Sequence, residues 1–469
     1  MSSNNQRTDA ALEAISPLDG RYASKCEECR RYFSEYALIR HRVFVELQWY
    51  LLLAECPDIP QVGPFSNETI DVVKNLENVT LEQAQQVKNY EKITNHDVKA
   101  IEYYIKERLE ETGLLELQKS KEFIHFCCTS EDINNLAYAK LLKNSMENLL
   151  RPAMISVVEK ICELAVKYAD VPLLSRTHGQ AATPTTFGKE MANFAARMRR
   201  FIVRDVDQVE YLGKFNGAVG NFNAHLVAYP ALNWPLIAKK FVEERLGLTY
   251  QMYSTQIECH DYIAELVDSI CRFNTCLLDF NMDMWTYISR DHLLMQPVAG
   301  EVGSSTMPHK VNPIDFENSE GNLGLSNAVL KFLSGKLPIS RLQRDLSDST
   351  TLRNIGVGFT HAYLAYKSVL RGLGKIAVNA PNMATELDGN WAVLAEPIQT
   401  VMRKGGLPLP YEQLKDFTRG QHVDQHGMRE FILKNCKELP EEDLARLLQL
   451  TPGNYIGMAT VLAKEIGKY

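Results

Sequence analysis

The stretch IAELVDSICRFNTCLLDFNMDMWTY, residues 263 to 287, decides the fold class. Its apolar side chains alternate steps of three and four residues at Ile263, Leu266, Ile270, Phe273, Leu277, Phe280, Met284 and Tyr287. The same spacing recurs at Leu352, Ile355, Phe359, Ala362, Tyr366, Val369, Leu373 and Ile376. Such apolar seams belong to long helices that need partner helices to cover them. We expect the two seams to cover one another across a subunit interface.

Proline is sparse in two long segments, which leaves room for such helices. No proline occurs between Pro64 and Pro152, or between Pro235 and Pro297. No alternation of strands and helices, no GxGxxG after a strand and no P-loop indicates a nucleotide-binding sheet. We therefore predict an all-α protein with three parts. They are a helical N-terminal domain (1–118), a long-helix bundle that forms a tetramer core (119–372) and a helical C-terminal domain (373–469).

The composition is that of an ordinary globular protein, with 45% hydrophobic and 23% charged residues among 469. No apolar run is long enough to predict a membrane span, and no apolar stretch follows the charges of the N-terminus, so a cytoplasmic protein is expected. The ten cysteines are expected to be free thiols. A net charge of −7 argues against a nucleic-acid surface, so an anionic ligand requires a local cluster of cations.

The loop GEVGSSTMPHKVNP, residues 300 to 313, carries the clearest chemical signal. Ser304 is a candidate base for removing a proton from carbon, and Lys310 and Asn312 can stabilise the oxyanion that forms. We expect Asn312 to cap a helix whose first residue is Pro313. The positive end of that helix dipole would then face the same point.

Two further segments resemble helix starts with polar side chains beside them. His178 precedes Thr183 and Pro184, which we interpret as an N-cap and a first helical residue. Thr129 and Ser130 begin a second capped helix with acids in its first turn. Helix starts bind carboxylates and phosphates, so those near Ser130, Pro184 and Pro313 could converge on one anionic ligand. For each residue alone, capping or a surface hydrogen bond is an equally complete explanation.

Other candidates are histidine and arginine side chains. His96 and Asp97 are adjacent, which suits either an imidazole that orients a substrate or a satisfied structural pair. Arg21, Arg344 and Arg353 are candidate ligands for phosphate or carboxylate, although each alone is more typical of a surface ion pair. Gln256 could orient a carboxylate or cap a helix.

Residues 300 to 313 match the signature of the fumarase/aspartase superfamily, whose members release fumarate from a substituted succinate. SPLDGRY, TNHDVKA, EFIHFCCTSEDINNL, SRTHGQ, GKFNGAVGN and TQIECHDYIAEL extend the resemblance from about residue 12 to Tyr455. Together they resemble the adenylosuccinate lyase family, in its longer bacterial-type branch. The resemblance implies cleavage of adenylosuccinate to AMP and fumarate, and the matching step that gives aminoimidazole carboxamide ribotide.

The resemblance also implies roles for individual residues. Ser304 would be the base and His178 the acid, with Lys310, Asn312 and His96 completing the catalytic set. The substrate would be held by Arg21, Tyr22, Asn95, Asp97, Thr129, Ser130, Gln256, Ser305, Asn318, Arg344, Ser349 and Arg353. It further implies a homotetramer with three subunits at each site, and neither a metal nor an organic cofactor.

Three rival interpretations remain open. Argininosuccinate lyase, aspartase and fumarase share the 300–313 loop, but only a nucleotide substrate needs the phosphate set of Arg21, Ser349 and Arg353. A purely structural helical protein is conceivable on this scaffold, although Ser304 and His178 are both present. A metal site at His422 and His426, or at the CxxC of Cys26 and Cys29, is the weakest interpretation.

Overall fold

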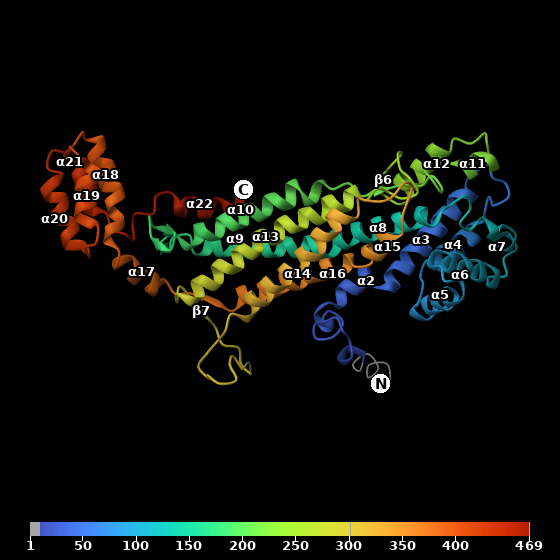
Figure 1. Ribbon diagram of the computed structural model, residues 1–469, viewed down its shortest axis with the longest axis horizontal. Helices are drawn as coiled ribbons and strands as arrows, with labels where there is room; N and C mark the ends of the chain where they lie inside the picture. The colour runs from blue at the N-terminus through green and yellow to red at the C-terminus, as the bar shows by residue number, and fades with distance from the viewer. Residues whose placement is uncertain (1–9, 301, 469) are drawn as a thin grey trace. The chain divides into compact units, whose positions relative to one another are not determined.

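The computed structural model describes residues 10–300 and 302–468 (Figure 1). These residues form two compact units. Unit 1 consists of the described residues of Met1–Ala153, Phe201–Asn274 and Gly321–Ala365. Unit 2 consists of those of Met154–Arg200, Thr275–Glu320 and Tyr366–Tyr469. Each unit is assembled from three separate segments of chain. The division at residues 118 and 372 stays a prediction from sequence.

Helices make up most of the described chain. Those of unit 1 are α2 (Glu27–Phe33), α3 (Glu35–Ala54), α4 (Asn67–Leu76), α5 (Leu81–Thr94), α6 (Asp97–Glu111), α7 (Leu115–Ser120), α8 (Ser130–Ser145), α11 (Asn223–Ala228), α12 (Trp234–Lys240) and α15 (Ser347–Leu352). Those of unit 2 are α17 (Ala380–Asp388), α18 (Ala395–Lys404), α19 (Pro410–Thr418), α20 (Gln425–Asn435), α21 (Glu441–Gln449) and α22 (Ala459–Glu465). Helices with residues in both units are α9 (Arg151–Lys167), α10 (Phe187–Arg204), α13 (Asp261–Ser289), α14 (Ile314–Lys336) and α16 (Ile355–Gly374).

Short elements complete the list. Single turns of 3-10 or π-helix are η1 (Ala23–Lys25), η2 (Lys121–Phe123), η3 (Met146–Leu150), η4 (Val206–Gln208), η5 (Phe241–Arg245), η6 (Trp391–Leu394) and η7 (Ile466–Lys468). Antiparallel strand pairs join β1 (Pro172–Leu173) to β4 (Thr185–Thr186), β2 (Arg176–Thr177) to β3 (Gln180–Ala181) and β7 (Leu293–Met295) to β8 (Ile376–Val378). A parallel pair joins β5 (Leu212–Gly213) to β6 (Thr249–Tyr250). The all-α prediction is confirmed.

The first apolar seam forms one uninterrupted helix, α13. The second is broken: Leu352 ends α15, a turn at Arg353 and Asn354 separates it from α16, and Ile376 lies in β8. Most of the seam side chains are buried within the single chain, for example Leu266 and Phe359. Our expectation that the seams cover one another across a subunit interface was therefore wrong, because neighbouring helices of the same chain already exclude water from them.

The core of unit 1 is built around α3, which packs along α8. Trp49 of α3 lies with its ring centroid 4.4 Å from that of Phe215 and 5.3 Å from that of Phe241. Two charged residues of the same helix, Arg42 and Glu46, are also buried. A helix that carries charges into a core needs partners for them, and these partners belong to the candidate site described below.

Unit 2 contains a small apolar core of its own at the C-terminus, where α18 to α21 gather around Ile398, Met402 and Ile432 (Figure 1). Elsewhere in unit 2, α10 approaches the end of α9 closely. A Cβ at Gly188 would lie 2.4 Å from the carbonyl oxygen of Ala165, so only glycine fits there. The β1–β4 and β2–β3 pairs occupy the segment between these two helices.

Candidate active site

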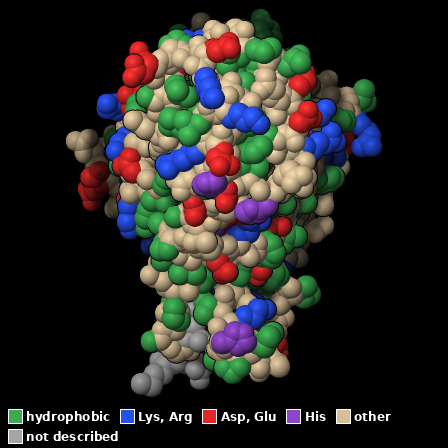
Figure 2. Space-filling model, turned by 90° about the vertical axis from the view of Figure 1, so that its left-hand side faces the viewer, with side chains coloured by type: hydrophobic (Ala, Val, Ile, Leu, Met, Phe, Trp, Pro, Cys, Tyr) green, Lys and Arg blue, Asp and Glu red, His purple; other side chains and the backbone are tan. Residues whose placement is uncertain are grey.

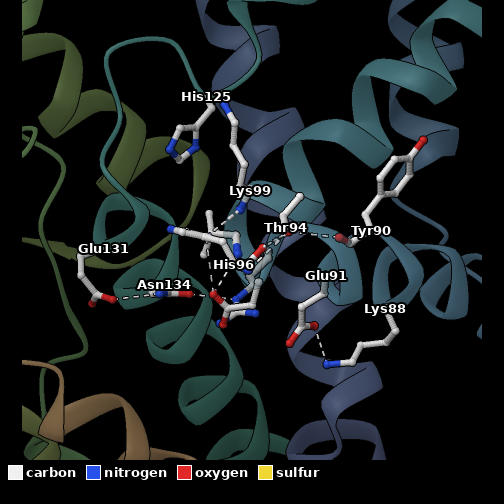
Figure 3. Close-up of polar contacts among 12 residues, drawn as sticks. Lys88, Tyr90, Glu91, Thr94, His96, Lys99, His125, Glu131 and Asn134 are labelled. Atoms are coloured by element: carbon white, nitrogen blue, oxygen red, sulfur yellow. Dashed lines mark hydrogen bonds and ion pairs between the residues drawn. The ribbon is translucent and has the colours of Figure 1, made fainter.

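His96 occupies the junction of two helices in unit 1. Asn95 ends α5 with a left-handed backbone (φ 48°), and His96 then caps α6. The Nδ1 atom of His96 accepts a hydrogen bond from the Lys99 backbone N–H at 3.1 Å, beside Thr94 (Figure 3). Because Nδ1 acts as an acceptor, a neutral ring carries its proton on Nε2. His96 thus presents an N–H donor on a side chain that is half exposed.

Asp97 joins this junction to two arginines. Its Oδ2 atom lies 2.7 Å from Nη2 of Arg42 and 2.9 Å from Nη2 of Arg353, while Oδ1 accepts from the Val98 backbone N–H at 2.9 Å. Burial favours the neutral carboxyl, but Arg42, the Val98 N–H and Arg353 together hold the pKa of Asp97 at about 2. The structure therefore brings Arg42, Asp97 and Arg353 together as a charged cluster, directly after His96 in the chain.

A second chain of polar contacts leads from Arg42 to the other predicted ligands. Arg42 Nε donates to Asn134 Oδ1 at 2.8 Å. Asn134 Nδ2 in turn donates to Glu131 Oε1 at 2.8 Å (Figure 3). Glu131 pairs with Arg344 Nη2 at 2.9 Å, and Arg344 Nη1 donates to Gln256 Oε1 at 3.5 Å. Two of the predicted substrate ligands, Arg344 and Gln256, are thus in direct contact.

Helix α8 begins beside this network, as expected from its sequence. Thr129 is the N-cap, and its backbone N–H donates to the Asp132 carboxylate at 2.8 Å. Asp132 is fully buried and forms an ion pair of 2.9 Å with the equally buried Lys214. This pair fixes the start of α8, and with it Thr129 and Ser130.

Unit 1 contains a cavity of about 380 Å³ that one of the predicted phosphate ligands lines. Arg353 lines it together with Glu35, Arg30 and Asp19. Arg21 and Tyr22 follow Asp19 and Gly20 in the chain; Arg21 is exposed, and Tyr22 packs against buried Leu18, Cys26 and Leu364. Ser349 is half-buried in α15, one turn before Arg353.

In unit 2, the loop with Ser304 is closed at its base. Asn312 Nδ2 donates to the Gly303 carbonyl at 2.6 Å, and a Cβ at Gly303 would lie 2.0 Å from the Lys310 carbonyl oxygen. Within this turn, Ser304 Oγ accepts backbone N–H groups from Thr306 at 3.2 Å and Met307 at 3.0 Å. The loop therefore surrounds the Ser304 oxygen with donors.

Neighbouring residues of the loop differ in their surroundings. Lys310 is exposed, and its ammonium has no ion-pair partner among residues 10–300 and 302–468. Ser305 is exposed, with Oγ 3.5 Å from Oγ1 of Thr306. Asn318 lies in α14 and accepts from the Ser368 hydroxyl at 2.7 Å. Helix α14 begins at Ile314, one residue after the predicted start, because the Asn312 side chain reaches back to Gly303 instead of capping.

His178 lies at the tip of the β2–β3 hairpin. His178 and Gly179 both have positive φ (53° and 74°), as in a type I′ turn. The helix start predicted at Pro184 was wrong, because Thr185 and Thr186 first pair with β1 and α10 begins only at Phe187. Thr186 performs the capping, since its Oγ1 accepts from the Lys189 backbone N–H at 3.1 Å. Thr183 donates to Glu396 instead.

Sequence reasoning missed Arg42, Glu131 and Asn134, which connect the predicted ligands. For Arg42 the sequence did contain a signal, since Arg42 and Glu46 are charged residues one turn apart within an apolar helix. Side chains of this kind are retained in a core only with partners. Glu46 accepts from His125, with 2.6 Å between Oε1 and Nδ1.

The alternative metal sites receive no support from the described residues. No group of three or more His, Cys, Asp or Glu side chains is arranged there to hold a metal ion. Cys26 and Cys29 are buried and are not joined in a disulfide bond. His422 precedes α20 and His426 lies in its first turn, so the two do not share a helix face; both are exposed.

The charge distribution of the surface and the apolarity of the helices bear on whether nucleic acid or a membrane is a partner. On the face drawn in Figure 2, acidic and basic side chains are interspersed and no continuous basic patch appears. Within the described part of the chain, we find no helix that combines the length and apolarity required to cross a membrane.

Comparison with known proteins shows which class of enzyme shares this sequence pattern and fold. Residues 20–329 match the family model described as "Lyase". A fumarate lyase from Mesorhizobium sp. BNC1 shares the fold with a TM-score of 0.74 at 17% identity, over 94% of this chain and 97% of that one. A 3-carboxy-cis,cis-muconate lactonizing enzyme from Pseudomonas putida follows at 0.70 and 20% identity, over 94% and 96%. The fold is that of lyases of this group.

Residues 340–456 match the model described as "Adenylosuccinate lyase C-terminal". Adenylosuccinate lyase of Escherichia coli K12 is 54% identical over 97% of this chain and 99% of its own length. The proteins of that name from Vibrio cholerae and Haemophilus influenzae are 52% and 50% identical, with the same coverage. The chain therefore belongs to the adenylosuccinate lyase family.

Proposed function

We propose that this lyase eliminates fumarate from adenylosuccinate, leaving AMP, and from the succinylated aminoimidazole carboxamide ribotide, with Ser304 as base and His178 as acid. The observation that carries the proposal is the surrounding of Ser304 Oγ by two backbone N–H donors in a closed loop. An ordinary serine hydroxyl is a weak base. Donors that favour its alkoxide are what removal of a proton from carbon requires.

Further features of unit 2 support the same chemistry. Helix α14 begins directly after the loop, so the positive end of its dipole lies beside Ser304 and Lys310. The Lys310 ammonium, without a carboxylate partner among the described residues, is available to neutralise the substrate's developing oxyanion.

The reaction needs only proton transfers from this chain. Ser304 takes the proton from the succinyl carbon that carries the β-carboxylate. The electron pair left there forms the carbon–carbon double bond of fumarate as the carbon–nitrogen bond breaks. His178, exposed at the hairpin tip, protonates the departing nitrogen. No metal or organic cofactor enters the balance.

Unit 1 supports binding of the anionic substrate. Arg353 and Arg344 are each paired with carboxylates, Arg353 with Asp97 and Arg344 with Glu131, which fixes the direction of both guanidinium groups. A nucleotide phosphate is suited to Arg353 in the cavity that this side chain lines, and Arg21 and Ser349 are the further proposed ligands. The succinyl carboxylates are suited to the start of α8, at Thr129 and Ser130, with Gln256 nearby. His96 offers its Nε2–H to the substrate.

The proposed enzyme is a cytoplasmic homotetramer in which each site draws residues from three subunits. Apolar side chains exposed on the long helices support association: Met282 and Trp285 of α13 are 53% and 46% exposed, and Leu325 and Phe332 of α14 are 53% and 58% exposed. The candidate residues also divide between the units. The ligands of the nucleotide lie in unit 1, and Ser304, Lys310 and His178 lie in unit 2.

The first test is direct. Purified protein is incubated with adenylosuccinate while its ultraviolet absorbance and the release of fumarate are followed, with argininosuccinate as the competing substrate. Ser304→Ala should lower kcat roughly a hundredfold or more with little change in substrate binding. Ser289→Ala, at an exposed serine of unit 2 outside the proposed site, is the matched control and should retain most of the turnover. Near-normal turnover of Ser304→Ala would exclude Ser304 as the base.

The second test concerns the shared sites. Inactive Ser304→Ala and His178→Gln proteins are mixed under mild denaturant, and subunit exchange is measured by mass tagging. Hybrid tetramers should contain some sites with both wild-type residues and recover measurable activity. Exchange without recovery would mean that both residues come from one chain.

A further inference from the structure

Glu386 of α17 is a carboxylate held by three cationic or titratable partners in unit 2. His292 Nε2 lies 2.7 Å from its Oε2, Arg176 Nη2 lies 2.5 Å from its Oε1, and Arg290 also pairs with Oε1. The Glu386 side chain is only 16% exposed. Burial opposes its charge, but the hydrogen bonds from Arg176, Arg290 and His292 together lower its pKa below the ordinary value. None of the roles proposed above uses this carboxylate.

Hydrogen bonds between the start of α17 and the residues after α13 fix the position of Glu386. Helix α17 is tied to the chain that follows α13, because Asn382 Nδ2 donates to the Arg290 carbonyl at 3.0 Å and Asn379 Nδ2 donates to the Asp291 carbonyl at 2.9 Å. His292 is almost fully buried. Arg290 and His292 therefore hold the carboxylate on a rigid support.

Arg176 carries that position to the hairpin of His178. Its Nη2 atom contacts Glu386, and its Nη1 atom donates to the Gly179 carbonyl at 3.1 Å, directly after His178. One guanidinium thus bridges the fixed carboxylate and the type I′ turn. The turn needs such support, because His178 has a left-handed backbone and an exposed side chain.

We infer that Glu386 is a positioning residue, which acts through Arg176 to hold the His178 hairpin in place for protonation of the leaving nitrogen. The inference rests on the proposed role of His178 as the acid. A planar guanidinium that grips a carboxylate and a carbonyl together fixes a direction as well as a distance. Loss of that grip misplaces the acid and leaves the nucleotide ligands of unit 1 unchanged.

Glu386→Gln tests the inference through kcat and KM. We expect kcat for adenylosuccinate to fall roughly tenfold or more, with KM within about twofold of wild type, because displacement of a reacting group by about 1 Å costs up to about a hundredfold. In the His178→Gln background, Glu386→Gln should change the residual kcat less than about twofold. Equal losses in both backgrounds would overturn the inference, since Glu386 would then act independently of His178.

Arg176→Lys is a second variant, which keeps the charge but loses the two-pronged contact, and it should reproduce the kcat loss. Asp443→Asn is the matched control. Asp443 is another buried carboxylate of unit 2, held by Lys404 and Arg446 of the C-terminal helices. Its replacement should leave kcat at the wild-type level. An equal loss in this variant would mean that any broken ion pair of unit 2 impairs the enzyme, and would also overturn the inference.

Hydrogen exchange separates this inference from the proposed function. In Glu386→Gln, the amides of residues 174–183 should exchange faster than in wild type and in Asp443→Asn, whatever the substrate. A wild-type protein that does not cleave adenylosuccinate would overturn the proposed function and leave this readout intact. Unchanged exchange in Glu386→Gln would overturn only the inference that Glu386 positions the hairpin, and would leave the proposed function standing.

Discussion

Gly303→Ala tests the closure of the Ser304 loop by steric means alone. In the structure, a Cβ at Gly303 would lie 2.0 Å from the Lys310 carbonyl oxygen, whereas real Cβ atoms essentially never approach closer than 3.0 Å. The obstacle is backbone, so it cannot rotate away as a side chain could. The backbone segments at Gly303 and Lys310 must therefore move apart by about 1 Å, and the hydrogen bond from Asn312 to the Gly303 carbonyl would lengthen with them.

The magnitude follows from that displacement. Lys310 and Ser304 would no longer face the same substrate atoms, and a shift of about 1 Å at reacting groups costs up to about a hundredfold in rate. We expect kcat to fall by roughly that factor. The free energy of unfolding should change by less than about 1 kcal/mol, because the loop is exposed and contributes little burial.

The assay is steady-state cleavage of adenylosuccinate, with urea unfolding as the measure of stability. Gly467→Ala is the matched control, because an added Cβ there meets nothing within 4 Å. If Gly303→Ala retains wild-type kcat, the close contact of Gly303 with Lys310 does not set the geometry of the base, and our account of Ser304 is wrong.

Two further predictions concern stability. Asp97→Asn should lower the free energy of unfolding by about 2 kcal/mol at pH 7, from the fall of the Asp97 pKa from 3.8 to about 2. Because the folded-state pKa is lowered, this contribution is present above pH 3.8 and is lost as the pH falls towards 2. Urea unfolding should therefore show a smaller difference in unfolding free energy between wild type and Asp97→Asn at pH 3 than at pH 7. An equal difference at both pH values would contradict the prediction. Thr186→Ala should cost about 1 kcal/mol of unfolding free energy, because it removes the cap of α10, and Thr183→Ala should cost less. If Thr183→Ala lost more stability than Thr186→Ala in thermal unfolding, Thr183 would be the helix cap, as the sequence alone predicted.

The sequence by itself predicted the helical class and the loop chemistry, because both depend on local patterns. An uninterrupted three-and-four spacing over residues 263 to 287 has one regular solution, and it forms α13. The capped start of α8 at Thr129 was predictable for the same reason, since cap and helix are neighbours in the chain. Family resemblance supplied the candidate residues on short motifs.

Only the tertiary structure decided which capping signals were used and what covered the apolar seams. Thr183 and Pro184 have the local pattern of a helix start, but pairing of Thr185 and Thr186 with β1 displaces the start to Phe187. Burial of the apolar seam of α13 within its own chain likewise replaced the expected contact between seams of different subunits. Contacts between distant segments, such as Arg42 with Asp97 or Arg176 with Glu386, leave no spacing in the sequence to reveal them. They form because a buried charge must find a partner wherever the fold brings one near.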